Sequence, residues 1–202
     1  MKIGVVSDTH IPELGPGLPS RLVEVFRGLD ILLHVGDVCE LHVLEDLQEM
    51  FTLTFAVWGE TDSDQVRHYL DEKRVVRFGD RALGMIHGHQ YGEAQEQANR
   101  RLNRLFRRVP DPGTLEDFLL AQFEGEDVDA IIFGHTHYPH VKMHKGVLLF
   151  NPGAVRPEPV RPGSGRSRPD RLESVRSGPG RKASAGILEV GERNIYGRIL
   201  SL

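Results

Sequence analysis

The sequence contains a single cysteine, Cys39, in 202 residues, so it cannot form an internal disulfide. It also lacks any apolar run of the roughly 18 residues that a membrane-spanning helix needs. The apolar run that follows Lys2 is too short for the core of a signal peptide. We therefore expect a soluble, cytoplasmic protein in a reducing compartment, with no membrane partner.

The charge balance lacks the basic excess that is typical of proteins that bind nucleic acid. The formal net charge is -4 and the pI is about 6.2. Because such proteins bind by neutralising phosphates with Lys and Arg, the composition gives no support for a nucleic-acid partner. At 39% hydrophobic residues, a chain of this length can bury the core of a single domain.

Apolar runs alternate with amphipathic segments in the first 58 residues. The pattern predicts strands over 2–6, 31–35 and 52–58, and helices over 20–29 and 40–50. Ser20 is the expected N-cap of the first helix. This alternation is typical of βαβ units, which form parallel sheets with helices packed on them.

The rest of the sequence predicts mostly strands, and two segments of different character. Strands are expected over 74–78, 82–87, 130–134, 147–151, 185–190 and 194–200. Segment 91–129 has helical spacing, whereas segment 156–182 is rich in Pro, Gly, Ser and Arg and predicts a flexible loop. We expect residues 1–202 to form one α/β domain of two packed sheets flanked by helices, with these two segments as additions.

Acids, histidines and asparagine follow the predicted strands, usually next to a glycine. These strand-end residues are Asp8, His10, Asp37, Glu60, Asp62, His87, His89, His135, His137 and Asn151. In open α/β sheets, ligands bind at the carboxyl ends of the strands. Glycine allows the sharp backbone turn after which the next side chain can project into that crevice.

These residue types are ligands for Mn, Fe, Co, Ni and Zn ions. Histidines at i, i+2 in "GHTH", and Asp8 with His10 in "DTH", could each point two side chains at one centre if the loop curls. A single "DTH" or "GD" is commonly a solvated turn, but the joint order of the motifs indicates a metal site. The absence of thiolate ligands argues against structural zinc and favours a hydrolytic pair of metals with Asp37 shared between them.

The motifs "D-x-H", "GD", "G-x-x-D", "HGH", "GHTH" and "NPG", in this order, resemble the calcineurin-like metallophosphoesterase superfamily. The short chain and the "HGH" motif look like its YfcE-type phosphodiesterase branch. The resemblance implies a four-layer α/β/β/α sandwich that holds two divalent ions, manganese first, with Ni, Co, Fe or Zn as alternatives. It also implies hydrolysis of a small or nucleotide-like phosphate ester by a hydroxide that bridges the two metals.

Carried over by motif, the resemblance implies specific roles for the strand-end residues. One metal would take Asp8, His10, Asp37 and His137, and the other Asp37, Glu60, His87 and His135. The catalytic residues would then be Asp37, the shared ligand, and Asn151, which would support the site from nearby. His89 is a candidate leaving-group acid, with His140 as an alternative, and Arg156 is a candidate contact for the anionic substrate.

The sequence departs from the family pattern at Glu60, where asparagine is usual, and at Thr61, where phosphoprotein phosphatases have a histidine. Glu60 could bind the second metal more tightly, or turn away and leave a mononuclear site. Three other functions stay open: a protein-binding scaffold like the retromer subunit of this fold, a nuclease, and a dinucleoside polyphosphate hydrolase. The sequence does not decide between a monomer and a homo-oligomer.

Overall fold

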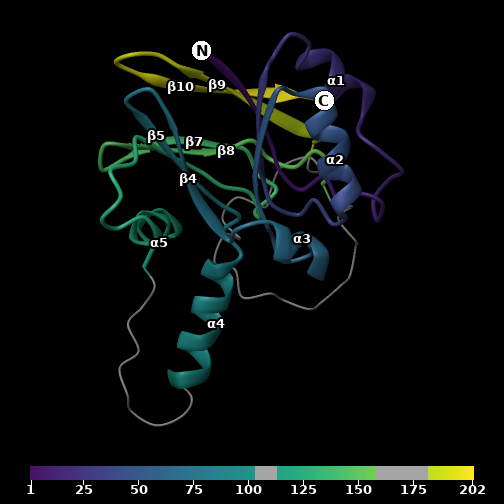
Figure 1. The fold of residues 1–202 in the computed structure, drawn as a ribbon. Coiled ribbons are helices and arrows are strands. Elements are labelled where there is room, and N and C mark those ends of the chain that lie inside the picture. Colours follow the sequence, from purple (N-terminus) through teal and green to yellow (C-terminus); the bar gives the residue numbers. More distant parts are fainter. Residues whose placement is uncertain (103–112, 158–181) are drawn as a thin grey trace.

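The computed structural model describes residues 1–102, 113–157 and 182–202, and the chain forms two five-stranded sheets with helices on their outer faces (Figure 1). Within the described residues, no helix is both long and apolar enough to cross a membrane.

The first sheet has the strand order β10-β9-β1-β2-β3. Its parallel part contains β1 (Lys2–Val6), β2 (Ile31–Val35) and β3 (Leu53–Val57), joined through α1 (Ser20–Val25) and α2 (Leu41–Met50). The predicted βαβ units are therefore confirmed. The final hairpin, β9 (Ser184–Val190) and β10 (Ile195–Ser201), adds to β1 in antiparallel fashion, which makes the sheet mixed.

The second sheet has the order β4-β5-β6-β8-β7 and is also mixed. Its strands are β4 (Lys73–Phe78), β5 (Arg81–Ile86), β6 (Ala130–Ile132), β7 (His140–His144) and β8 (Val147–Asn151). The strands β5, β6 and β8 run parallel, so their carboxyl ends lie at the same edge of the sheet.

The two sheets pack face to face, and helices cover the outer face of each. Side chains of alternate strand residues fill the space between the sheets, among them Ile3, Val5, Leu33, Leu83, Met85, Ile132 and Phe150. On the outer face of the first sheet, Leu22 and Phe26 at α1 and Val43, Leu44 and Leu47 of α2 form a second apolar cluster. On the other side, Leu119 of α5 (Leu115–Gln122), with the adjoining Phe123, packs on the second sheet. The predicted α/β/β/α sandwich is confirmed.

Two elements were not predicted from the sequence, and one predicted cap is wrong. Strand β7, at the sheet edge, has only two apolar residues, Val141 and Met143, and both are exposed. Helix α3 (Asp64–Tyr69) is a short helix with only Val66 buried. Ser20 lies inside α1 because the extended Pro19 is the N-cap, and no side chain caps that end.

Segment 91–129, predicted as helical, contains α4 (Gln90–Leu102) and α5. Helix α4 projects away from the sheets (Figure 1). Residues 103–112, together with most of the predicted loop at 156–182, lie outside the described residues.

The packing predicts that two apolar residues of α2 contribute very different amounts to the free energy of unfolding. Leu47 is fully buried against the first sheet, whereas Met50 is 43% exposed. Leu47→Ala should therefore lower the free energy of unfolding by about 2–5 kcal/mol, and the matched Met50→Ala by no more than about 0.5 kcal/mol. Urea denaturation measures both values. Equal losses in the two variants would contradict this account of the outer layer.

Candidate metal centre

The loops that follow β1, β2 and β6 share an unusual backbone conformation. In each loop, two residues at i, i+2 have positive φ: Asp8 and His10, Asp37 and Cys39, and His135 and His137, with values between 45° and 75°. Non-glycine residues adopt this left-handed conformation rarely and at an energetic cost. The curled loop expected for the "DTH" and "GHTH" motifs is therefore present.

Backbone hydrogen bonds tie these loops to one another. The Asp8 N–H donates to the Gly36 carbonyl at 3.1 Å, and the His10 N–H donates to the Asp37 carbonyl at 3.2 Å. On the second sheet, the Gly134 N–H donates to the His87 carbonyl at 2.9 Å. These hydrogen bonds hold the loops in register, so that their side chains converge.

Glycine is required where the loops approach the site most closely. A Cβ atom on Gly36, which has φ +94°, would lie 2.5 Å from Nδ1 of His87. A Cβ atom on Gly59 would lie 2.3 Å from Oδ1 of Asp37. Both distances are shorter than a van der Waals contact, so any side chain here would displace a candidate ligand.

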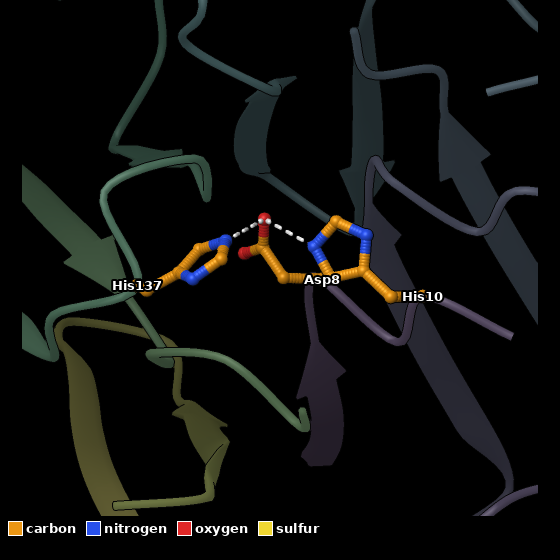
Figure 2. A group of neighbouring side chains, drawn as sticks. All are labelled: Asp8, His10 and His137. Atoms are coloured by element: carbon orange, nitrogen blue, oxygen red, sulfur yellow. Dashed lines mark ion pairs between the residues drawn. The ribbon is translucent and has the colours of Figure 1, made fainter. Parts of the chain in front are cut away.

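Asp8, His10 and His137 form one half of the candidate centre (Figure 2). Oδ1 of Asp8 lies 3.1 Å from Nε2 of His137 and 3.9 Å from Nε2 of His10. All three side chains are buried, and Asp8 is fully inaccessible. The two loops that supply these residues come from different sheets, so the group forms where the sheets meet.

Asp37 links this group to the other half of the centre. Its Oδ2 lies 3.3 Å from Nε2 of His87 and 3.8 Å from Nε2 of His10, and Oδ1 of Asp8 lies 4.0 Å from Nε2 of His87. Nδ1 of His87 lies 2.7 Å from the Val35 carbonyl, to which its N–H can donate. That hydrogen bond would leave Nε2 available as a metal ligand.

Glu60 and His135 lie at the more accessible side of the site. Oε1 of Glu60 is 3.5 Å from Nδ1 of His135, and the side chains are 33% and 20% exposed. The rings of His135 and His87 are 5.4 Å apart, so Glu60 stands near the end of the site that contains His87. Asp8, His10, Asp37, His87 and His137 thus lie together, and His135 and Glu60 adjoin them at the His87 end.

Asn151 hydrogen-bonds to the backbone of the loop that follows β6. Its Nδ2 donates to the Gly134 carbonyl at 2.7 Å and to Oγ1 of Thr136 at 3.1 Å, and its Oδ1 accepts the Gly153 N–H. It therefore fixes the loop that contains His135 and His137.

Asp62 has a structural role that sequence reasoning missed. Its buried carboxylate accepts the backbone N–H groups of Asp37, Cys39 and Gly59, at 3.2, 2.6 and 2.6 Å. It thereby joins the loop after β2 to the loop after β3. The "G-x-x-D" motif marks Asp62 in the sequence, but it does not reveal from which backbone N–H groups the carboxylate accepts hydrogen bonds.

His89 and Arg156 occupy positions beside the ligands. The His89 ring lies 5.4 Å from Trp58, whose indole also faces the Arg67 guanidinium at 5.0 Å. The Arg156 guanidinium donates to the carbonyls of Leu14, at 3.0 Å, and Gly17. A contact between Arg156 and a substrate stays a prediction, and it would require Arg156 to give up these bonds.

The charges of the site are balanced between carboxylates and imidazoles. Burial alone would lower the pKa of His87, but Asp37 and Asp8 outweigh it and raise that pKa to about 10. Burial alone would raise the pKa values of Asp8 and Asp37, but the nearby histidines lower both. His89 differs, because burial and then the positive His87 and His135 lower its pKa to about 3.

The donor set fits divalent metal ions. Oδ2 of Asp8 and Nε2 of His10 are buried without a hydrogen-bond partner within the described ranges, and Oδ1 of Asp8 and Nε2 of His87 meet only other candidate ligands, at 3.1 Å from His137 and 3.3 Å from Asp37. Buried polar atoms are rarely left in this state unless something satisfies them. Nitrogen and oxygen donors from His and Asp suit Mn, Fe, Co, Ni or Zn ions.

Comparisons with known proteins identify the family. The sequence model of the "Calcineurin-like phosphoesterase superfamily domain" matches residues 1–167. The chain belongs to this superfamily, as the motifs predicted. It is 32% identical over 156 residues to a probable metallophosphoesterase of Methanocaldococcus jannaschii, covering 76% of this chain and 68% of that protein. It is 22% identical over 168 residues to a phosphodiesterase of the same organism, covering 76% and 83%.

The solved structures show the same fold. The chain matches Vps29 of Chaetomium thermophilum with a TM-score of 0.66 at 16% identity, covering 100% of this chain and 97% of that one. At this identity the likeness establishes the fold alone.

The raised pKa of His87 predicts that metal binding depends on pH. The metal-free imidazole is protonated near neutral pH, so a metal at Nε2 must displace a proton. The apparent affinity for Mn²⁺ should therefore rise by about tenfold per pH unit for each proton displaced. Isothermal titration calorimetry of the metal-free protein at several values between about pH 6 and 8 measures this. An affinity that does not change with pH would contradict the predicted displacement.

Proposed function

We propose that this protein is a metal-dependent phosphodiesterase that hydrolyses a small or nucleotide-like phosphate ester at a centre of two divalent ions, manganese first. The observation that supports it most is the buried convergence of Asp8, His10, Asp37, His87 and His137 from loops of both sheets. The phosphodiesterase of Methanocaldococcus jannaschii, a relative by sequence, gives independent support.

In this proposal, Asp8, His10, Asp37 and His137 hold one ion, and Asp37, Glu60, His87 and His135 hold the other. When bound, two such ions acidify a water and clamp the oxygens of the transferring phosphoryl group. Asp37 is suited to the shared position because its Oδ2 faces both His10 and His87, at 3.8 and 3.3 Å. Its Oδ1 accepts the Thr61 N–H at 2.9 Å, which fixes the carboxylate plane.

The surroundings of the site favour substrates with good leaving groups. Thr61 stands where the phosphoprotein phosphatases of the superfamily have a histidine, and its Oγ1 lies 3.5 Å from Nδ1 of His10. His89, the candidate acid, has a pKa of about 3 and is neutral near pH 7. A neutral imidazole is a weak proton donor, so aryl or nucleotide-like diesters should react better than alkyl monoesters.

A second candidate function is a protein-binding scaffold of the same fold. Two observations favour it: Glu60 replaces the usual asparagine, and the fold matches Vps29. The buried Asp and His set argues for chemistry, because burying two carboxylates against several histidines is costly and brings a scaffold no benefit.

Substitution of the shared ligand tests the proposal. Asp37→Ala should reduce Mn²⁺-dependent hydrolysis of a chromogenic phosphodiester, bis(p-nitrophenyl) phosphate, by more than about 100-fold, because both ions lose a ligand. The matched control is Asp30→Ala, which removes an exposed carboxylate and should retain wild-type activity. Hydrolysis at the wild-type rate by folded Asp37→Ala would rule out the shared-ligand assignment.

Glu60 provides a second, independent test. Its additional negative charge should bind the second ion more tightly and weaken that ion as a Lewis acid. Glu60→Asn should therefore keep or raise the hydrolysis rate while weakening the binding of the second Mn²⁺. Glu60→Gln removes the negative charge but keeps the side-chain length, so it separates the effect of charge from the effect of a shorter side chain. A correctly folded but inactive Glu60→Asn protein would show that Glu60 does more than adjust the second ion.

A further inference from the structure

A second group of potential ligands lies on the far side of His10. While Nε2 of His10 faces Asp8, the other ring nitrogen points away from the candidate centre (Figure 2). That nitrogen, Nδ1, lies 3.8 Å from Sγ of Cys39 and 3.5 Å from Oγ1 of Thr61. The only thiol of the chain is therefore next to one candidate ligand of the phosphoesterase centre.

Glu13 completes this group from the same loop as His10. Its Oε2 lies 3.8 Å from Sγ of Cys39. The ligand atoms of His10, Glu13 and Cys39 all lie within 4.8 Å of one another. The imidazole and the thiol are buried, whereas Glu13 is exposed, so an ion can reach the group from the solvent along the glutamate.

The spacing of these atoms suits a tetrahedral ion. With Zn–S near 2.3 Å and Zn–N near 2.0–2.1 Å, a tetrahedral angle separates sulfur and nitrogen by roughly 3.5 Å. Sγ of Cys39 lies 3.8 Å from both Nδ1 of His10 and Oε2 of Glu13, so a shift of a few tenths of an ångström in the side chains would bring these distances to the tetrahedral value. A thiolate and a carboxylate together neutralise a divalent charge.

We propose that His10, Glu13 and Cys39 form a separate binding site for one thiophilic divalent ion such as Zn²⁺, with water as the fourth ligand. Binding deprotonates Cys39 and releases that proton to solvent, and the sulfur–metal bond replaces the sulfur–hydrogen bond. The thiolate distinguishes this site from the phosphoesterase centre, whose candidate ligands are nitrogen and oxygen alone.

The two sites require opposite tautomers of His10. A neutral imidazole offers one nitrogen lone pair and carries its proton on the other nitrogen. An ion in the phosphoesterase centre uses Nε2, which places the proton on Nδ1 toward Cys39 and Thr61. An ion held by Cys39 and Glu13 uses Nδ1, which places the proton on Nε2. The sites are therefore antagonistic, a consequence that rests on the role of His10 in the proposed function.

Cobalt is a probe that separates the two sites. We expect Co²⁺, added to the metal-free full chain, to produce a thiolate-to-cobalt charge-transfer band in the near ultraviolet. Because Cys39 is the only thiol, this band reports the proposed site alone. Cys39→Ser should abolish the band. Glu13→Gln should weaken Co²⁺ binding followed at the band by about 10-fold or more, and the matched exposed control Glu45→Gln should leave it unchanged.

Manganese tests the antagonism. Prior loading with Mn²⁺ should shift the Co²⁺ titration of the band to about 10-fold higher concentration, within the usual range of coupling between sites. A band that survives in Cys39→Ser overturns the site. Absence of the band in folded Asp8→Ala also overturns it, because loss of that ligand weakens Co²⁺ binding at the phosphoesterase centre and leaves Nδ1 of His10 available. A band that Mn²⁺ does not shift overturns the antagonism. Since the band needs no turnover, failure of the hydrolysis assay alone leaves the site standing.

Discussion

The structure depends on burying two aspartates and several histidines at one point where the two sheets meet. Burial of a carboxylate costs several kcal/mol unless an opposite charge or a metal compensates it. Here Asp8 is fully inaccessible, and the nearest groups to its Oδ1 are the imidazole nitrogens of His137, at 3.1 Å, and His10, at 3.9 Å. Protonated histidines can supply the compensation, and divalent ions are suited to replace them. The same electrostatic requirement connects the sandwich fold to the proposed chemistry.

Strained backbone conformations make this arrangement of side chains possible. Paired residues with positive φ turn both side chains of a loop toward the centre, and Gly36 and Gly59 leave space for His87 and Asp37. Asp62 and Asn151 then hold the loops through backbone hydrogen bonds. Strained conformations persist only where the surroundings fix them, and this hydrogen-bond network does so. His10 is the point at which the candidate centre and the proposed thiolate site share one ring.

Much of the fold and of the site could be predicted from the sequence, because both depend on local patterns. Apolar periodicity located the βαβ units and most strands, and the polar residues at strand ends identified residues that the fold brings together. The edge strand β7 was missed because its alternating "HVKMH" contains only two apolar residues, too few to distinguish it from a loop, and both are exposed in the structure. The structural role of Asp62 and the role proposed for Cys39 were missed because they depend on contacts between distant loops, 22 to 29 positions apart in sequence.

The central claim is that imidazoles and carboxylates from separate loops hold a pair of divalent ions. Crystals of the protein grown with Mn²⁺ and measured at the manganese absorption edge test it most directly. The account predicts two anomalous peaks, both within bonding distance of Asp37, with His10 and His137 at one and His87 and His135 at the other. One peak only would contradict the two-ion centre. No peak at saturating manganese would contradict the metal centre itself.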